Sequence, residues 1–154
     1  MTYPNAEVAR LLNAEFIPVR INTQDQPKVA RRFHLMWSPI LVALDHRDFP
    51  LHRIVGYIPP AEMVAQLHFI RALNEMRSAR PANALQIFRQ LYNDFPRADV
   101  VPEAIYWEGI AAYRQSKNKE DLWVVWRQLA ANYPNSLWAA RTTLLPEADT
   151  SLGD

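Results

Sequence analysis

The chain contains no cysteine and only three glycines. The lack of cysteine excludes structural disulfides, cysteine-based zinc sites and a cysteine nucleophile. Three widely separated glycines cannot form the glycine-rich loops that cradle phosphates. No window of about 18 apolar residues could span a membrane, and no basic start with an apolar core resembles a signal peptide. These absences predict a cytoplasmic protein that does not insert into membranes.

An excess of charge of one sign is also missing. The chain has 17 basic and 16 acidic residues among 154, for a net charge of +1. Because nucleic-acid binding usually requires a basic excess or stripe, that class of partner is not expected. With 49% hydrophobic and 21% charged residues, the composition is that of a globular protein.

Twelve prolines divide the whole chain into short elements. Proline cannot continue a helix or donate to a strand ladder, so it falls at element boundaries. With the hydrophobic periodicity, these breaks predict helices over 5–13, 27–34 and 60–76, and strands over 15–22, 39–44 and 51–57. The apolar run 39–44 ends at a charged turn, which predicts a strand buried on both faces. Gly56 predicts a bulge or a close approach near the end of the last strand.

The second half is expected to be entirely helical, with helices over 82–94, 102–114, 120–132 and 137–144. Phe88-Arg89-Gln90-Leu91-Tyr92-Asn93-Asp94-Phe95-Pro96 aligns with Trp126-Arg127-Gln128-Leu129-Ala130-Ala131-Asn132-Tyr133-Pro134, 38 residues later (126 − 88 = 38). Four positions are identical, and three more pair similar residues. A period of this size among helices is typical of a helical-hairpin solenoid. The polar tail, 146–154, is expected to fray.

Residues 1–70 resemble an α/β thioredoxin-like domain of the DUF255 and thioredoxin-7 type, N-terminally truncated. The resemblance rests on the helix-then-strand segment 3–22, on Ser38-Pro39-Ile40-Leu41-Val42 and on Arg53-Ile54-Val55-Gly56-Tyr57. It implies a cis peptide bond at Ser38-Pro39 and a peptide groove formed by Trp37, Ser38 and Pro39. The alternative for Pro39 is a trans proline that only starts a strand. The alternative for Trp37 is an amphipathic residue at the mouth of a strand.

The start of the thioredoxin-like domain is missing from the matched region. The family's CxxC motif and first core strand would precede residue 3 and are not in the sequence. Without that strand, the segments around Val19 and Leu41 must pair directly, pair with another chain as a homo-oligomer through sheet edges, or leave unpaired backbone groups. Two explanations stay open: the natural protein starts upstream, or the domain is a degenerate relic stabilised by the helical part or by a partner.

Residues 71–145 resemble all-α helical-hairpin tetratricopeptide (TPR-like) repeats. Small and aromatic residues recur in the order Ala84-Leu85, Phe88, Leu91, Phe95-Pro96, Ala104, Trp107, Gly109 and Ala112-Tyr113. Gly109 and Ala112 would allow a close approach of paired helices. About two repeats are present, fewer than such arrays usually need, so the helix over 60–76 is expected to pack on both parts as a cap.

An aromatic group in the repeats supplies the candidate interface residues: Tyr106, Trp107, Trp123 and Trp126. Such residues mostly fill seams between helices, but Trp123 lies off the apolar stripe of its helix and is the candidate for peptide contact. The four histidines lack the spacing of a metal set, no serine has a hydrolase context, and no carboxylate pair shares a helix face. No cofactor is expected.

Two functions remain. The first is a non-catalytic interaction module that binds protein or peptide segments. The alternative is a fragment of a thioredoxin-family thiol–disulfide oxidoreductase whose CxxC lies upstream. The chain as given favours the first, because the redox reaction needs a thiolate nucleophile and the sequence has none.

Overall fold

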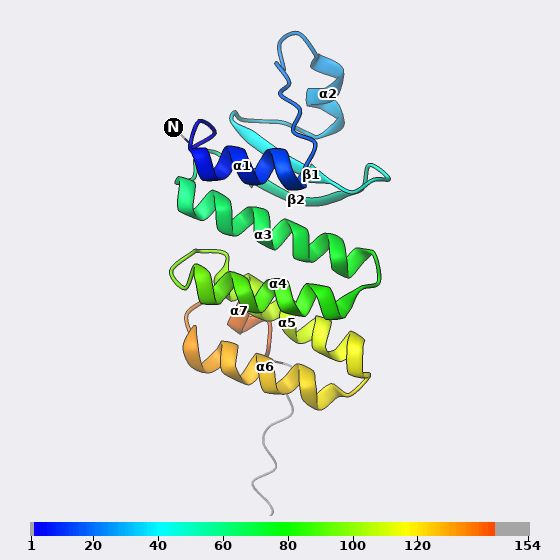
Figure 1. Cartoon of the computed structure of the whole chain (residues 1–154), viewed down its shortest axis with the longest axis vertical. Helices are drawn as coiled ribbons and strands as arrows, with labels where there is room; N and C mark the ends of the chain where they lie inside the picture. Colours follow the sequence, from blue (N-terminus) through cyan, green and yellow to red (C-terminus); the bar gives the residue numbers. More distant parts are fainter. Residues whose placement is uncertain (1, 144–154) are drawn as a thin grey trace, which may run out of the picture.

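The computed structural model describes residues 2–143 as a stack of helices with a small sheet at one end (Figure 1). The elements are α1 (Ala6–Glu15), α2 (Pro27–Arg32), β1 (Ile40–Leu44), β2 (Pro50–Val55), α3 (Pro60–Arg77), α4 (Pro81–Asp94), α5 (Val101–Ser116), α6 (Lys119–Asn132) and α7 (Leu137–Ala140). The predicted helices up to α6 are therefore present, with ends shifted by one or two residues. The helix predicted over 137–144 has only the four residues of α7, and residue 144 lies outside the described residues. The predicted tail, 146–154, lies outside the described residues.

The predicted α/β thioredoxin-like fold is wrong. Within residues 2–143 the sheet has two strands, β1 and β2, which pair antiparallel as a simple hairpin, and the remaining elements are helices. The predicted strand over 15–22 is also wrong, since α1 continues to Glu15 and residues 16–22 belong to no helix or strand. Their β-forming side chains supply propensity, but a strand exists only where a neighbour completes its ladder.

Strand β1 is not buried on both faces as predicted. Only Ala43 is buried, because β1 has a partner on one edge and helices on one face. Leu41 and Ala43 lie on that face with Ile54 of β2. The bulge lies between Ala43 and Leu44 rather than at Gly56. Gly56 instead adopts φ +86° in open space, so its conformation, and not a close approach, requires glycine.

Helix α3 joins two hydrophobic clusters, as expected of a cap that packs on both parts. The smaller cluster contains Val64, Leu67 and Ile70 of α3 with residues of α1 and the sheet. The larger cluster begins with Phe69 and Phe88, both fully buried with ring centroids 5.9 Å apart, and extends through α4, α5, α6 and α7. Each such side chain contributes about 1.5–3 kcal/mol relative to an exposed one.

An ion pair ties the β-hairpin to α3. The carboxylate of Asp45 accepts hydrogen bonds from the backbone N–H groups of Arg47 (2.8 Å) and Phe49 (2.9 Å), and it pairs with Arg77 of α3. The Arg77 guanidinium also lies 3.6 Å from the centroid of the Phe49 ring. The bond from Arg77, followed by that from Phe49, lowers the pKa of Asp45 from 3.8 to about 2.

The 38-residue period appears in the geometry of the helices. Helices α4 and α6 have the same length and begin and end 38 positions apart. Each closes with the same bond, from Phe95 N–H to the Leu91 carbonyl (2.8 Å) and from Tyr133 N–H to the Leu129 carbonyl (2.9 Å). The backbone angles also agree, with φ −128° and ψ 56° at Phe95 and φ −133° and ψ 52° at Tyr133. The sequence repeat therefore encodes a repeated helix and turn.

Candidate functional site

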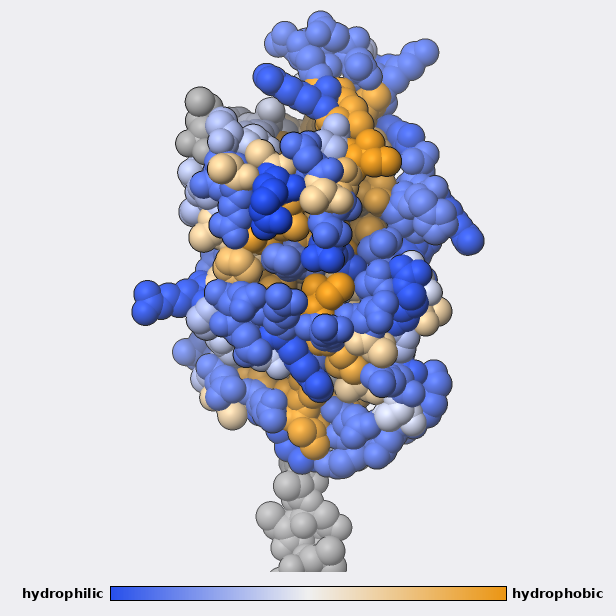
Figure 2. Space-filling view, in the orientation of Figure 1, coloured by the Kyte–Doolittle hydropathy of each residue, from blue (hydrophilic) through white to orange (hydrophobic). Residues whose placement is uncertain are grey.

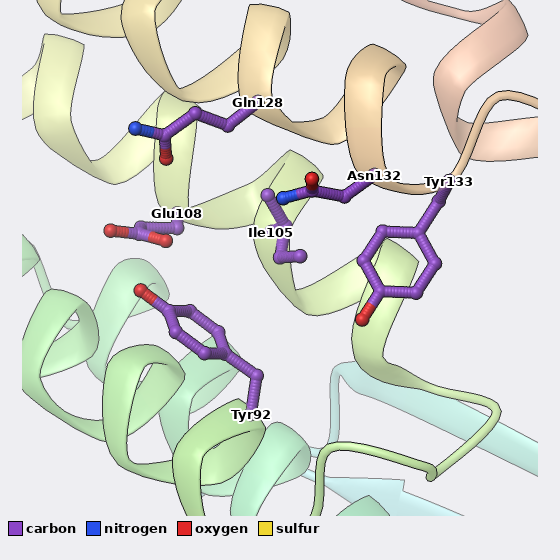
Figure 3. A pocket seen from close by; sticks show the side chains of 6 residues that line it. All are labelled: Tyr92, Ile105, Glu108, Gln128, Asn132 and Tyr133. Atoms are coloured by element: carbon purple, nitrogen blue, oxygen red, sulfur yellow. The ribbon is translucent and has the colours of Figure 1, made fainter.

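A polar hollow lies between α4, α5 and α6 (Figure 3). Its lining residues are Tyr92 from α4, Ile105 and Glu108 from α5, Gln128 and Asn132 from α6, and Tyr133 just beyond α6. Figure 3 shows the Tyr92 hydroxyl directed toward Glu108, while Gln128 and Asn132 enter from the opposite helix. The hollow is thus built by the two repeat-equivalent helices, with α5 as its floor.

Glu108 is the unusual member of this set, because it occupies a core position. It follows Ala104 and Ile105 at helical spacing, and all three residues are buried. Its side chain is only 5% exposed, and its Oε1 accepts a 2.8 Å bond from Nε of Arg89 on α4. A buried carboxylate needs such a partner, since an uncompensated buried charge is costly.

The ion pair sets the electrostatics of the rim. Arg89 is 57% exposed, so its guanidinium reaches from the buried carboxylate toward solvent. The hydrogen bond to Glu108 raises the pKa of Arg89. Burial raises the pKa of Tyr92, and the charge of Glu108 acts in the same direction, which keeps the Tyr92 hydroxyl protonated and able to donate.

The chemistry of the hollow is hydrogen bonding. Gln128 and Asn132 are four residues apart on α6, so both carboxamides face the same groove and each can donate and accept. The hollow has a volume of about 140 Å³. Small-molecule and cofactor sites usually occupy about 300–1,000 Å³, so this hollow fits a single side chain of a bound segment better than a cofactor.

The predicted interface aromatics lie mainly in the seam between α5 and α6. The rings of Tyr106 and Trp126 stack with centroids 4.8 Å apart, and the Trp126 indole N–H donates to the Tyr106 carbonyl at 3.0 Å. Trp107 and Trp138 flank Tyr106 at 6.2 and 5.2 Å. These contacts agree with the seam-filling interpretation. Trp123 is half-buried and is not among the residues that line the hollow.

The close approach predicted at Gly109 is confirmed. A Cβ built on Gly109 would lie 2.7 Å from both Cδ1 and Nε1 of Trp126, and 3.2 Å from Cδ1 of Leu122. Only glycine therefore allows the Trp126 indole to cross α5 at this depth. The Trp126 ring then reaches the backbone of Tyr106.

The predicted peptide groove lies at the sheet end of the stack, away from the hollow (Figure 1). The Ser38-Pro39 peptide bond is cis, as the resemblance implied. Trp37 is 72% exposed, and Ser38 and Pro39 are exposed as well. Among the described residues, none of the three lines the hollow.

Sequence reasoning missed the residues of the hollow. The sequence patterns predict no buried carboxylate on α5 and no site at the polar positions of α6. One signal was available: the buried stripe of α5 contains a glutamate where an apolar residue is expected. A charged residue on such a stripe predicts a buried partner or a site, and Arg89 is that partner.

No metal centre or membrane segment is found in residues 2–143. No three histidine, aspartate or glutamate side chains there come together as metal ligands. His52 bonds instead to Gln66 at 2.9 Å, and His68 stacks on Phe95, as expected of locally bonded histidines. The helices described are each too short or too polar to cross a bilayer.

In comparisons with known proteins, no family model, curated protein or solved structure matches this chain.

Proposed function

We propose that this chain is a protein-interaction module whose hollow between α4 and α6 receives a side chain from a bound protein segment. The observation that carries the proposal is the buried Glu108 carboxylate, paired with Arg89 at the rim, beneath two carboxamides on the facing helix. The carboxamides of Gln128 and Asn132 suit the alternating N–H and C=O groups of a peptide backbone. The hydroxyl of Tyr92 and the carboxylate of Glu108 suit a donor-bearing side chain.

The module acts without catalysis and, in this proposal, in the cytoplasm. Thiol–disulfide exchange needs a thiolate, and the sequence has no cysteine. We therefore expect the chain to give only background turnover in an insulin-reduction assay. Turnover above background that follows the purified chain through its last purification step would refute the non-catalytic assignment.

A displayed library of random peptides, panned against the immobilised chain, tests the binding function. Enriched peptides should bind the purified chain and should lose at least tenfold in affinity, or about 1.4 kcal/mol, when Gln128→Arg fills the hollow. The matched control is Gln90→Arg, which changes the repeat-equivalent, exposed position on α4 that lies outside the hollow. Affinity should survive that change.

Two outcomes would contradict the proposal. One is a failure to enrich any peptide that binds the native chain above background. The other is peptides that bind both variants as tightly as the parent, which would locate the binding surface elsewhere. Circular dichroism of both variants verifies that the helices are retained.

A further inference from the structure

The segment between α1 and β1, residues 16–39, contains α2 and is called here the arm. It projects beyond the sheet at the end of the molecule opposite the hollow (Figure 1). From residue 12 to residue 42 no residue is buried, and α2 contributes nothing to either core cluster. Ordering a chain costs about 1–2 kcal/mol per residue, and the arm has little buried apolar surface of its own to offset that cost.

The arm nevertheless carries large apolar side chains. Ile17 is 93% exposed, Val19 73%, Met36 93% and Trp37 72%. Ile17, Val19 and Ile21 recur at every second position, as in a strand that buries one face. Figure 2 shows an apolar strip just below the hydrophilic top of the molecule, with further apolar patches lower on the same face. Exposed apolar groups at this density mark an interaction surface.

The sheet below the arm has an open edge. Gly56 N–H donates to the Pro39 carbonyl at 2.8 Å, and the register pairs Ile40 with Val55 and Val42 with Arg53. Hydrogen-bonded and non-hydrogen-bonded pairs alternate in an antiparallel ladder, so the N–H and C=O groups of Ile40 and Val42 point away from β2. Within residues 2–143, the backbone N–H groups of residues 17 and 19–21 have no backbone partner either, and Pro18 has no N–H.

We propose that two copies of this chain associate about a two-fold axis, with β1 paired antiparallel to β1 of the second copy and the apolar side chains of the arms buried between them. Such pairing is self-complementary, because Ile40 of each copy would face Val42 of the other. It would convert a two-stranded hairpin into a four-stranded sheet, within the usual size range of sheets.

The exposed area is sufficient for a dimer. Four large side chains that are mostly exposed present on the order of 600 Å² per copy, with ~150–250 Å² for the aromatic one. A standard interface buries about 800 Å² per partner, and contacts along β1 would supply the rest.

Charge gives this association a distinctive signature. The arm has four basic residues and one acidic residue: Arg20, Lys28, Arg31, Arg32 and Asp25. Two arms in one interface therefore repel each other, and salt screens that repulsion. Self-association should strengthen as salt rises, whereas binding of an acidic partner protein to the same surface would weaken.

Sedimentation velocity of the full chain over a range of concentrations tests the proposal. We expect a species of twice the 17.9 kDa chain mass. Its dissociation constant should decrease as the salt concentration is raised from roughly 0.1 M to 1 M, because the Debye length shrinks from ~10 Å to ~3 Å over that range. Ile17→Lys should raise the dissociation constant at least tenfold. The control Leu137→Lys alters a residue of α7 that is 79% exposed and lies away from the arm, and should leave the constant unchanged.

A second variant addresses the strand edge itself. Val42→Pro removes an N–H that points away from β2, a position where an edge strand tolerates proline, and it should also abolish the dimer. Amide exchange at Ile40 and Val42 should slow as the protein concentration rises, which reports pairing without any mutation. A chain that stays monomeric at all concentrations, a dimer that Ile17→Lys leaves intact, or a dimer that salt weakens would each overturn the proposal.

Discussion

Replacing Gly109 by alanine tests how the two repeats are joined. In an ordinary helix interior, glycine to alanine stabilises by about 1 kcal/mol, since alanine loses less backbone entropy. Here the new methyl group would lie 2.7 Å from two atoms of the Trp126 indole. Those atoms belong to a rigid ring rather than to the end of a flexible side chain, so the ring or the helix must move.

The cost of that movement can be estimated from the contacts that hold the ring. Overpacking a core costs about 1–3 kcal/mol. The Trp126–Tyr106 hydrogen bond and the stacked ring pair contribute about 0.5–1.5 kcal/mol each, and both weaken when the ring shifts. After the helix term is subtracted, Gly109→Ala should destabilise the chain by about 2 kcal/mol. At this chain length that lowers Tm by roughly 4–8 °C.

Urea unfolding followed by circular dichroism measures the effect, and a double-mutant cycle assigns its cause. In a Trp126→Leu background the alanine methyl no longer meets an indole, so Gly109→Ala should become neutral or slightly stabilising. If Gly109→Ala raised the stability of the native sequence by its full helix-propensity value, the seam would be looser than described. Equal destabilisation in both backgrounds would show that Trp126 is not the obstacle.

Three further changes probe the core and the titrating groups. Leu129→Ala, at a fully buried position, should cost about 2–5 kcal/mol in urea unfolding, whereas Val124→Ala at an exposed site on the same helix should cost much less. The pKa of Asp45 is about 2 in the folded chain and 3.8 ordinarily, so its stabilising contribution is complete above pH 3.8 and is lost as the pH falls toward 2. Asp45→Asn should therefore lower the free energy of unfolding at neutral pH and make it depend less on pH between 3.8 and 2. Burial lowers the pKa of His52, so the unfolded chain binds a proton more readily and the stability should fall as the pH drops below 6.5. In His52→Gln, the urea midpoint should change less with pH over that range.

The helical half could be predicted from sequence because its information is local. The repeated aromatic-proline turns fix where α4 and α6 end, and the apolar stripes fix which faces pack. Gly109 was interpretable for the same reason: a small residue within a stripe of larger ones predicts a close approach. These patterns act within one or two helical turns, so no distant partner was needed to interpret them.

The strand predicted over 15–22 failed for the opposite reason. Phe16, Ile17, Val19 and Ile21 have the residue types and the alternation of a strand, but a strand is a property of a pair. Local propensity therefore predicted an extended backbone without determining whether any neighbour would pair with it. The thioredoxin-like assignment rested in part on that strand and is wrong as well, although the cis bond at Ser38-Pro39 that the resemblance implied is present.

The hollow was not predicted because its lining residues do not come from equivalent positions of the two repeats. Gln128 and Asn132 correspond to Gln90 and Asp94 in the first repeat, yet the hollow takes Tyr92 from α4, where the second repeat has Ala130. The site exists because unlike positions of two similar helices face the same floor on α5, formed by Ile105 and Glu108. Sequence similarity indicates which positions correspond, whereas a site of this kind depends on the positions that differ.

The two proposed binding surfaces differ in how far buried residues preorganise them for binding. The floor of the hollow is formed by Glu108 and Ile105, which are both buried on α5, so ligand binding requires little ordering of that floor. The arm buries no residue, so much of the gain from covering Ile17 and Trp37 must offset the ordering of the arm itself. Affinity at the hollow should therefore depend on direct contacts, while association through the arm should respond strongly to substitutions that stiffen the arm without touching its partner.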